Sequence, residues 1–326
     1  MSKGGRILNQ PNFFIVGAPR CGTTALYSYL AGHPDIGMSK DKEPNFFASD
    51  VVRHQRNSTT LAQYLSNFDR ATGKKRIGEA STAYLASRKA PREILDFSPS
   101  AQIIIMVRNP IDVIHSMHSF RIFGTEEHIT RFELAVDSWE TRYWRSGPFR
   151  GEPVLRSSYR EITRFSEQIQ RYFDAFGEER VHVIVFDDFA KAPSIAYENV
   201  LSFLGLPSDK RSNFEIINGN RRVRSQALQK WLMYPYTILR PIEHVSSTLW
   251  RGVRGIARRI NYVHEPHPAI EAAFRQRLER EYAPEVRNLE RLLGVNLDHW
   301  LARPSPANLN LEGAASEFRL GEPSRA

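Results

Sequence analysis

A short apolar run, Phe13–Ala18, passes directly into a glycine-containing loop and then into a helical pattern that begins at Thr23. Continuous apolar runs of this length are typical of strands that are buried on both faces of a parallel sheet. The loop turns through Gly17 and Gly22, which directs several backbone N–H groups toward one point at the positive end of the helix. The stretch therefore predicts a strand–loop–helix unit that binds an anion.

Further strands and helices alternate along the chain after this unit. Apolar runs predict the strands, and apolar residues at helical spacing predict the helices. The expected strands are Arg76–Ala80, Ala101–Val107 and Val181–Phe186, and the expected helices are Pro110–Phe120, Tyr159–Phe176, Pro193–Leu204, Ala269–Tyr282 and Pro284–Leu293. This alternation predicts an α/β fold: a P-loop-like parallel β-sheet core flanked by helices on both faces, with a helical C-terminal extension.

The length of 326 residues suits one sizeable core with an appendage. We expect a single domain over residues 1–302, with its core at about 12–225 and the helical extension at 226–302. Residues 303–326 are polar and contain Pro, Gly and Ser, which predicts a disordered tail. The first residues lack an apolar leader, and no apolar run approaches the ~20 residues of a membrane-spanning helix, so the expected location is cytoplasmic.

The spacing from Gly17 to Gly22 matches the G-x-x-x-x-G part of the loop of nucleotide triphosphatases, but the lysine of that motif is missing. Thr23 and Thr24 follow Gly22 directly, and the cation of the loop is Arg20. A guanidinium can bind two anion oxygens at once. A Mg-dependent kinase or triphosphatase stays open as an alternative, because Thr24 and the aspartates of the VFDDF stretch are candidate metal ligands.

The stretch GAPRCGTTALYSYLAGHP resembles the 5′-phosphosulfate loop of sulfotransferases that use 3′-phosphoadenosine 5′-phosphosulfate (PAPS) as sulfuryl donor. The resemblance implies that PAPS is bound by Arg20, Cys21, Gly22, Thr23 and Thr24, and that Arg20 also stabilises charge during the transfer. Cys21 stands where the family commonly has serine. Sulfate esters carry less charge than phosphate esters, so no metal is expected.

Two further segments resemble the same family where it binds the phosphates of the nucleotide. Arg108 follows the strand IIIMV, and Ser116 lies eight positions later, as in the family's 3′-phosphate site. Arg108 also follows a predicted parallel strand, at the edge where such sheets bind ligands. The segment NGNRRVRS predicts a loop, and the resemblance implies that Arg222 and Arg224 close it over the phosphates.

The segment KDKEPNFF resembles the K-E-x-x-F-F segment of the carbohydrate-acting, heparan-sulfate-type branch, where the glutamate is the general base. This implies that Glu43 takes the proton from the acceptor hydroxyl or amine, which attacks poorly while protonated. In the stretch GEASTAYL, Ala80 replaces a lysine of that branch, and Glu79 and Ser81 are expected to line the acceptor pocket. The implied acceptor is a small molecule, glycan or glycolipid; its identity and the oligomeric state stay open.

The formal net charge of +9 keeps a third class open, a basic module that binds nucleic acid or membrane. Aromatic and basic residues do not alternate as a base-stacking platform requires, so no nucleic-acid partner is expected. The basic helix near Trp250 has an apolar stripe, which leaves a weak membrane-surface contact open. Cys21 is an alternative covalent nucleophile, because a helix N-terminus lowers the pKa of a thiol.

Overall fold

A computed structural model of the full chain describes residues 9–51, 59–145, 159–215, 222–223, 225, 228–229, 260–263 and 268–301. Its centre is a five-stranded parallel sheet in the order β2–β3–β1–β4–β5. The strands are β1 (Phe13–Gly17), β2 (Ile36–Met38), β3 (Arg76–Ala80), β4 (Gln102–Val107) and β5 (Val181–Val185). The predicted α/β fold with a parallel core is therefore confirmed.

β1 is the central strand of the sheet, and Ile15 pairs with Ala80 of β3 on one side and Ile104 of β4 on the other. Every residue of β1 is buried, as its continuous apolar sequence predicts. Gly78 of β3 has a packing role, because a Cβ there would lie 2.0 Å from the ring of Phe13. Glycine thus allows the ring of Phe13 to lie directly against the neighbouring strand.

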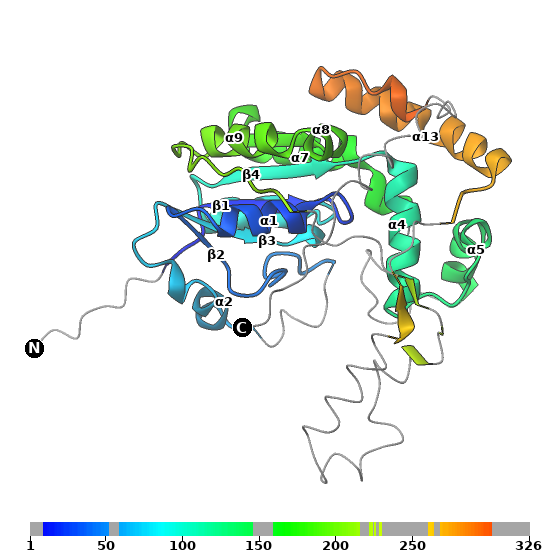
Figure 1. Cartoon of the computed structure of the whole chain (residues 1–326), viewed down its shortest axis with the longest axis horizontal. Coiled ribbons are helices and arrows are strands. Elements are labelled where there is room, and N and C mark those ends of the chain that lie inside the picture. The colour runs from blue at the N-terminus through cyan, green and yellow to red at the C-terminus, as the bar shows by residue number, and fades with distance from the viewer. Residues whose placement is uncertain are drawn as a thin grey trace, which may run out of the picture.

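Helices flank this sheet, as Figure 1 shows, with α7 against β4 and β5 and α1 against β1 and β2. α1, α4 and α8 each follow a strand, β1, β4 and β5 respectively, and helices between strands are the usual connection in a parallel sheet. The helices are α1 (Thr23–Ala31), α2 (Leu61–Ser66), α3 (Ala90–Phe97), α4 (Pro110–Phe123), α5 (Phe132–Arg145), α7 (Phe165–Phe176), α8 (Phe186–Lys191), α9 (Pro193–Phe203) and α13 (Ala272–Leu293).

Three elements differ from the sequence-based expectation. The helix expected over Tyr159–Phe176 is a 3₁₀ turn, η3 (Glu161–Thr163), followed by α7. The two helices expected on either side of residue 283 form the single helix α13, with Pro284 inside it. Part of the expected NGNRRVRS loop is the short strand β6 (Arg222–Val223), which pairs antiparallel with β7 (Tyr262–Val263). For α13 and for β6, contacts with distant parts of the chain override the local pattern.

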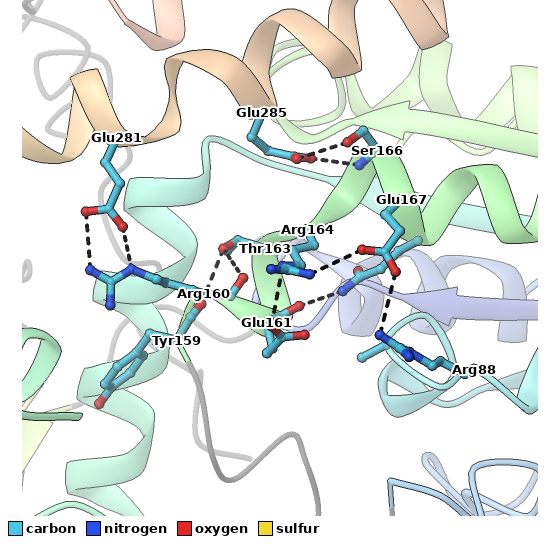
Figure 2. A network of polar contacts seen from close by, with 12 residues as sticks. Arg88, Tyr159, Arg160, Glu161, Thr163, Arg164, Ser166, Glu167, Glu281 and Glu285 are labelled. Atoms are coloured by element: carbon cyan, nitrogen blue, oxygen red, sulfur yellow. Dashed lines mark hydrogen bonds and ion pairs between the residues drawn. The ribbon is translucent and has the colours of Figure 1, made fainter. Parts of the chain in front are cut away.

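Polar side chains of α13 bind residues just before α7 and in its first turn (Figure 2). Glu285 accepts hydrogen bonds from the backbone N–H of Ser166 at 2.7 Å and from its hydroxyl at 2.9 Å. Glu281 forms an ion pair with Arg160, whose side chain also makes a second hydrogen bond to it. α13 also packs against α4, so the C-terminal helix contacts two elements of the core.

The helix expected near Trp250, Arg224 and the tail from 303 onward lie outside the described residues. Among the helices that are described, none combines the length and the apolar composition that crossing a lipid bilayer requires.

Candidate active site

The anion loop lies between β1 and α1 and has the geometry that its glycines predict. Gly22 is the N-cap of α1 with φ 88° and ψ 4°, a left-handed conformation that favours glycine. A Cβ at Gly22 would lie 3.0 Å from the ring of Phe186, so the loop also approaches α8 closely. The first N–H groups of α1 have no partner within the helix, and they are available to an anion at this point.

Arg20 projects from the loop onto α4. Its Nε donates a hydrogen bond to Oγ of Ser116 at 2.9 Å, and its guanidinium lies 5.2 Å from the ring centroid of Phe120. Ser116 is buried, whereas the ring of Phe120 is 48% exposed. The structure thus brings together two predicted site residues that are 96 positions apart in the sequence.

Arg108 follows β4 at the same edge of the sheet. Its guanidinium lies 4.7 Å from the ring centroid of Phe186, and its Nη2 lies 3.6 Å from a carboxylate oxygen of Asp112. Its Nε has no hydrogen-bond partner among the residues that the structure describes. Burial, and secondly the charge of Arg108, lowers the pKa of Arg20. Two neighbouring guanidinium groups repel each other, and a bound polyanion would relieve that repulsion.

Cys21 faces the core, and its side chain is completely buried. Its Sγ–H donates to the carbonyl oxygen of Pro19 at 3.5 Å. Burial raises the pKa of the thiol to about 12, against the opposing charges of Arg108 and Arg20. A thiol in this state is a poor nucleophile, so the structure argues against the alternative of covalent catalysis by Cys21. Its backbone N–H remains part of the loop.

Glu43 lies on the loop that crosses the carboxyl end of β3. Its backbone N–H donates to the carbonyl oxygen of Ala80 at 2.9 Å. Its Oε1 lies 2.8 Å from Nζ of Lys42 and accepts a hydrogen bond from Oγ1 of Thr82 at 3.2 Å. β3 pairs in parallel with β1, so Glu43 lies at the same edge of the sheet as the anion loop. The carboxylate side chain is 40% exposed and remains accessible.

Glu79 and Ser81 differ from the expectation that they line an acceptor pocket. Both are completely buried, and the hydroxyl of Ser81 donates to Oε1 of Glu79 at 2.6 Å. Oε2 of Glu79 accepts a hydrogen bond from the hydroxyl of Tyr64 on α2. Burial raises the pKa of Glu79 to about 7, although the hydrogen bonds from Ser81 and Tyr64 oppose this shift. No local pattern in the sequence indicates this network, because it joins separate segments.

The loop expected to cover the nucleotide is described only in part. Arg222 is placed by its backbone in β6, which packs against α4. Just beyond it, the N–H of Ser225 donates to Oδ1 of Asn261 at 2.8 Å, and Nε2 of Gln229 donates to the carbonyl oxygen of Phe123 at 2.8 Å. This segment is therefore anchored at the C-terminal end of α4, the helix that carries Ser116.

Asp187, which belongs to the VFDDF stretch considered for Mg²⁺, is engaged by the C-terminal 3₁₀ turn η6 (Asp298–Trp300). Its Oδ2 accepts a hydrogen bond from Nε1 of Trp300 at 2.5 Å and lies 3.0 Å from Nε2 of His299. Within the described part of the chain, no group of three or more His, Cys, Asp and Glu side chains is placed to hold a metal ion.

Comparisons with known proteins identify the family to which this chain is similar. The family model described as the sulfotransferase domain matches residues 10–231. Bifunctional heparan sulfate N-deacetylase/N-sulfotransferase 1 of Caenorhabditis briggsae is 21% identical over 197 residues, covering 60% of this chain and 23% of that protein. Heparan sulfate glucosamine 3-O-sulfotransferase 6 of Homo sapiens is 36% identical over 101 residues, covering 31% of this chain and 28% of that protein.

The chain thus spans about a quarter of the length of these curated relatives. A solved structure, a sulfotransferase from Alicyclobacillus acidocaldarius, is 27% identical with a TM-score of 0.66, and the match covers 90% of this chain and 100% of that one. The family model includes the anion loop, Glu43, Arg108 and Ser116, and it matches well over half of the 326 residues. The chain therefore belongs to the sulfotransferase domain family.

Proposed function

We propose that this protein transfers the sulfuryl group of PAPS to a hydroxyl or amine of an acceptor by in-line displacement. The observation that carries the proposal is the convergence of Arg20, Ser116 and Arg108 at the carboxyl edge of β1 and β4, with the 2.9 Å bond between Arg20 and Ser116. Two guanidinium groups beside the start of a helix suit a ligand with several negative charges. PAPS carries such charges at its 3′-phosphate and its phosphosulfate.

Each group of the site has a distinct role in this proposal. Arg108 and Ser116 hold the 3′-phosphate, and Arg222 and Arg224 cover the phosphates from the segment beyond residue 215. The N–H groups of Cys21, Gly22, Thr23 and Thr24 bind the phosphosulfate. Arg20 stabilises the negative charge that develops on the leaving oxygen, and donors placed at developing charge are the usual means of accelerating such transfers.

Glu43 receives the proton of the attacking hydroxyl or amine. Its contacts with Lys42 and Thr82 both engage Oε1, so Oε2 is the oxygen proposed to accept the proton. A general base in this position contributes typically ~10²–10⁴-fold to the rate. The proposed acceptor is a carbohydrate or glycolipid, which is supported by the names of the relatives, two of which are heparan sulfate sulfotransferases.

The first test is calorimetric titration of the full chain with 3′,5′-adenosine bisphosphate, the product that remains after transfer. We expect micromolar affinity without Mg²⁺, and the Arg108→Ala variant should bind at least about tenfold more weakly, because it loses charge-assisted hydrogen bonds. Arg164→Ala, which removes an exposed arginine directly after η3, is the control and should bind like the native chain. Tighter binding of Mg²⁺–ATP than of the bisphosphate would instead support a kinase or triphosphatase.

The second test follows label from sulfate-labelled PAPS into a panel of glycans, glycolipids and small alcohols. Transfer to a sugar acceptor would identify the class, and Glu43→Gln should reduce turnover by at least about a hundredfold while it retains affinity for the bisphosphate. Undiminished transfer by Glu43→Gln would show that another group is the base.

A further inference from the structure

The loop that carries Glu43 has an unfavourable backbone conformation. Glu43 and Asn45 have φ values of 63° and 52°, so two non-glycine residues within three positions are left-handed. This region costs free energy for residues with a Cβ atom, and such residues persist only where surrounding contacts determine the conformation. Contacts with other parts of the chain must therefore hold this loop.

Successive residues at the end of β3 supply them. The carbonyl oxygen of Ala80 accepts the N–H of Glu43 at 2.9 Å, and Oγ of Ser81 accepts the N–H of Asn45 at 3.0 Å. Oγ1 of Thr82 donates to the carboxylate of Glu43 at 3.2 Å. Within the loop, Nδ2 of Asn45 donates to the carbonyl oxygen of Glu43 at 2.9 Å. Both left-handed residues are thus bonded to the strand end.

Glu79 lies behind these contacts and connects to the loop along two routes. On one route it accepts the hydroxyl of Ser81, whose other bond holds Asn45. On the other it accepts the hydroxyl of Tyr64, whose ring is stacked on Phe46 with centroids 4.5 Å apart. A buried carboxyl group is costly unless several donors satisfy it. Here two of its donors, Ser81 and Tyr64, each contact a residue of the loop that bears the proposed base.

We propose that Glu79 and Ser81 are positioning residues that hold Glu43 in place for proton transfer. The inference rests on the proposed role of Glu43 as the base. In this proposal the hydroxyl of Ser81 donates to Glu79 and accepts the N–H of Asn45. The orientation of this one hydroxyl therefore fixes the loop relative to the end of β3. Neither residue touches the reacting atoms, because both are completely buried.

The direct test is amide hydrogen exchange of peptides that cover residues 41–47, measured in the full native chain. Ser81→Ala removes the acceptor of the Asn45 N–H, and Glu79→Gln retains one acceptor oxygen where two are used. We expect exchange in this segment to be about tenfold faster in Ser81→Ala, because it loses the bond to the Asn45 N–H. Exchange should also be clearly faster in Glu79→Gln, because this variant loses one of the two bonds that hold Ser81 and Tyr64 in place.

The matched control is Thr163→Val, which removes another buried hydroxyl, bonded to Tyr282 at 3.1 Å, and should leave exchange of residues 41–47 unchanged. If Ser81→Ala and Glu79→Gln exchange like the native chain in this segment, the loop is held by other contacts and the proposal is wrong. This readout needs neither PAPS nor acceptor, so it decides the proposal even if the bisphosphate fails to bind.

A kinetic readout separates positioning from general stability. With labelled PAPS and the acceptor class found in the panel, both variants should lower kcat about tenfold or more and leave KM for PAPS within about twofold, because the anion loop is unchanged. Thr163→Val should keep both constants. A variant that raises KM for PAPS without lowering kcat would show that the network supports nucleotide binding rather than Glu43.

Discussion

Glu79 is a completely buried carboxyl group near the carboxyl end of β3, and its charge state affects the stability of the fold. Burial raises its pKa to about 7, whereas in the unfolded chain the pKa has its ordinary value of 4.5. Between these two values the native state keeps a proton that the unfolded state has lost. Stability therefore falls as pH rises through this window, and the loss is complete above the native pKa.

We expect this residue to cost the native chain about 2 kcal/mol of unfolding free energy between about pH 5 and pH 8. Glu79→Gln cannot ionise, so urea unfolding should show a smaller decrease over the same range by that amount. Glu167→Gln, a partly exposed residue on α7, is the control and should follow the native pH dependence. Parallel curves for Glu79→Gln and the native chain would show that the group is already ionised at about pH 5.

At the scale of the element, α13 continues through a residue that normally ends a helix. Pro284 lies on the exposed side of α13, while Tyr282, Val286 and Leu289 pack into the core. Proline in a helix interior lacks an N–H and disfavours the preceding turn. Burial of these apolar side chains and the bonds of Glu281 and Glu285 to the core offset that cost.

Pro284→Ala should therefore stabilise the chain by about 1–3 kcal/mol, because it restores a helical hydrogen bond and removes no buried surface. The midpoint of urea unfolding measures this effect. Ala283→Gly, at the neighbouring helical position, should change stability in the opposite direction by about 1 kcal/mol. No gain in Pro284→Ala would mean that the proline already fits the helix without cost.

The elements differ in how far the sequence predicts them. The sequence predicts β1, β4 and β5 nearly to the residue, because buried parallel strands are largely apolar runs. The bounds predicted for β3 are also confirmed, although its sequence RIGEA contains two charged residues and signals a strand only weakly. β2 was not predicted, because Ile36–Met38 is too short for such a run. The continuity of α13 also could not be predicted, since it depends on side chains of the core that lie more than 100 residues away.

The site divides in a similar way. The anion loop and the Arg108–Ser116 pair lie within contiguous motifs, so their residues could be named from the sequence, although their roles stay predictions. The network of Glu79, Ser81 and Asn45 could not, because β3 and the Glu43 loop meet only in the folded sheet. The burial of the Cys21 side chain also could not be predicted from the motif. The side chain faces the core, although the backbone of Cys21 is part of the anion loop.

In the whole molecule, the 3₁₀ turn η6 packs at the carboxyl ends of the neighbouring strands β4 and β5. Trp300 of η6 is buried; it donates to Asp187 just beyond β5, and its carbonyl oxygen accepts Nδ2 of Asn109 just beyond β4 at 3.0 Å. Asn109 also caps α4 by accepting the N–H of Ile111 at 2.9 Å. The segment after α13 thus joins two strand ends beside Arg108.

Trp300→Ala should lower the unfolding free energy by about 3–5 kcal/mol, because it leaves a large cavity and removes the hydrogen bond to Asp187. His299→Ala tests the neighbouring exposed contact with the same aspartate and should cost less than about 1 kcal/mol. Thermal unfolding of both variants with and without the bisphosphate provides the measurement. Equally small decreases in unfolding free energy for the two variants would show that packing of η6 contributes little to the stability of the core.

Arg20 and Glu43, the two residues proposed for the chemistry, both have a left-handed backbone, with φ values of 65° and 63°. At these two positions, a substitution that increases the stability of the fold would decrease the proposed activity. Glycine at either position would relieve about 1 kcal/mol of backbone strain. It would also remove the cation of the loop or the proposed base. Selection of variants by melting temperature alone would therefore favour an inert protein, so stability engineering of this chain should leave both positions fixed and monitor turnover alongside unfolding.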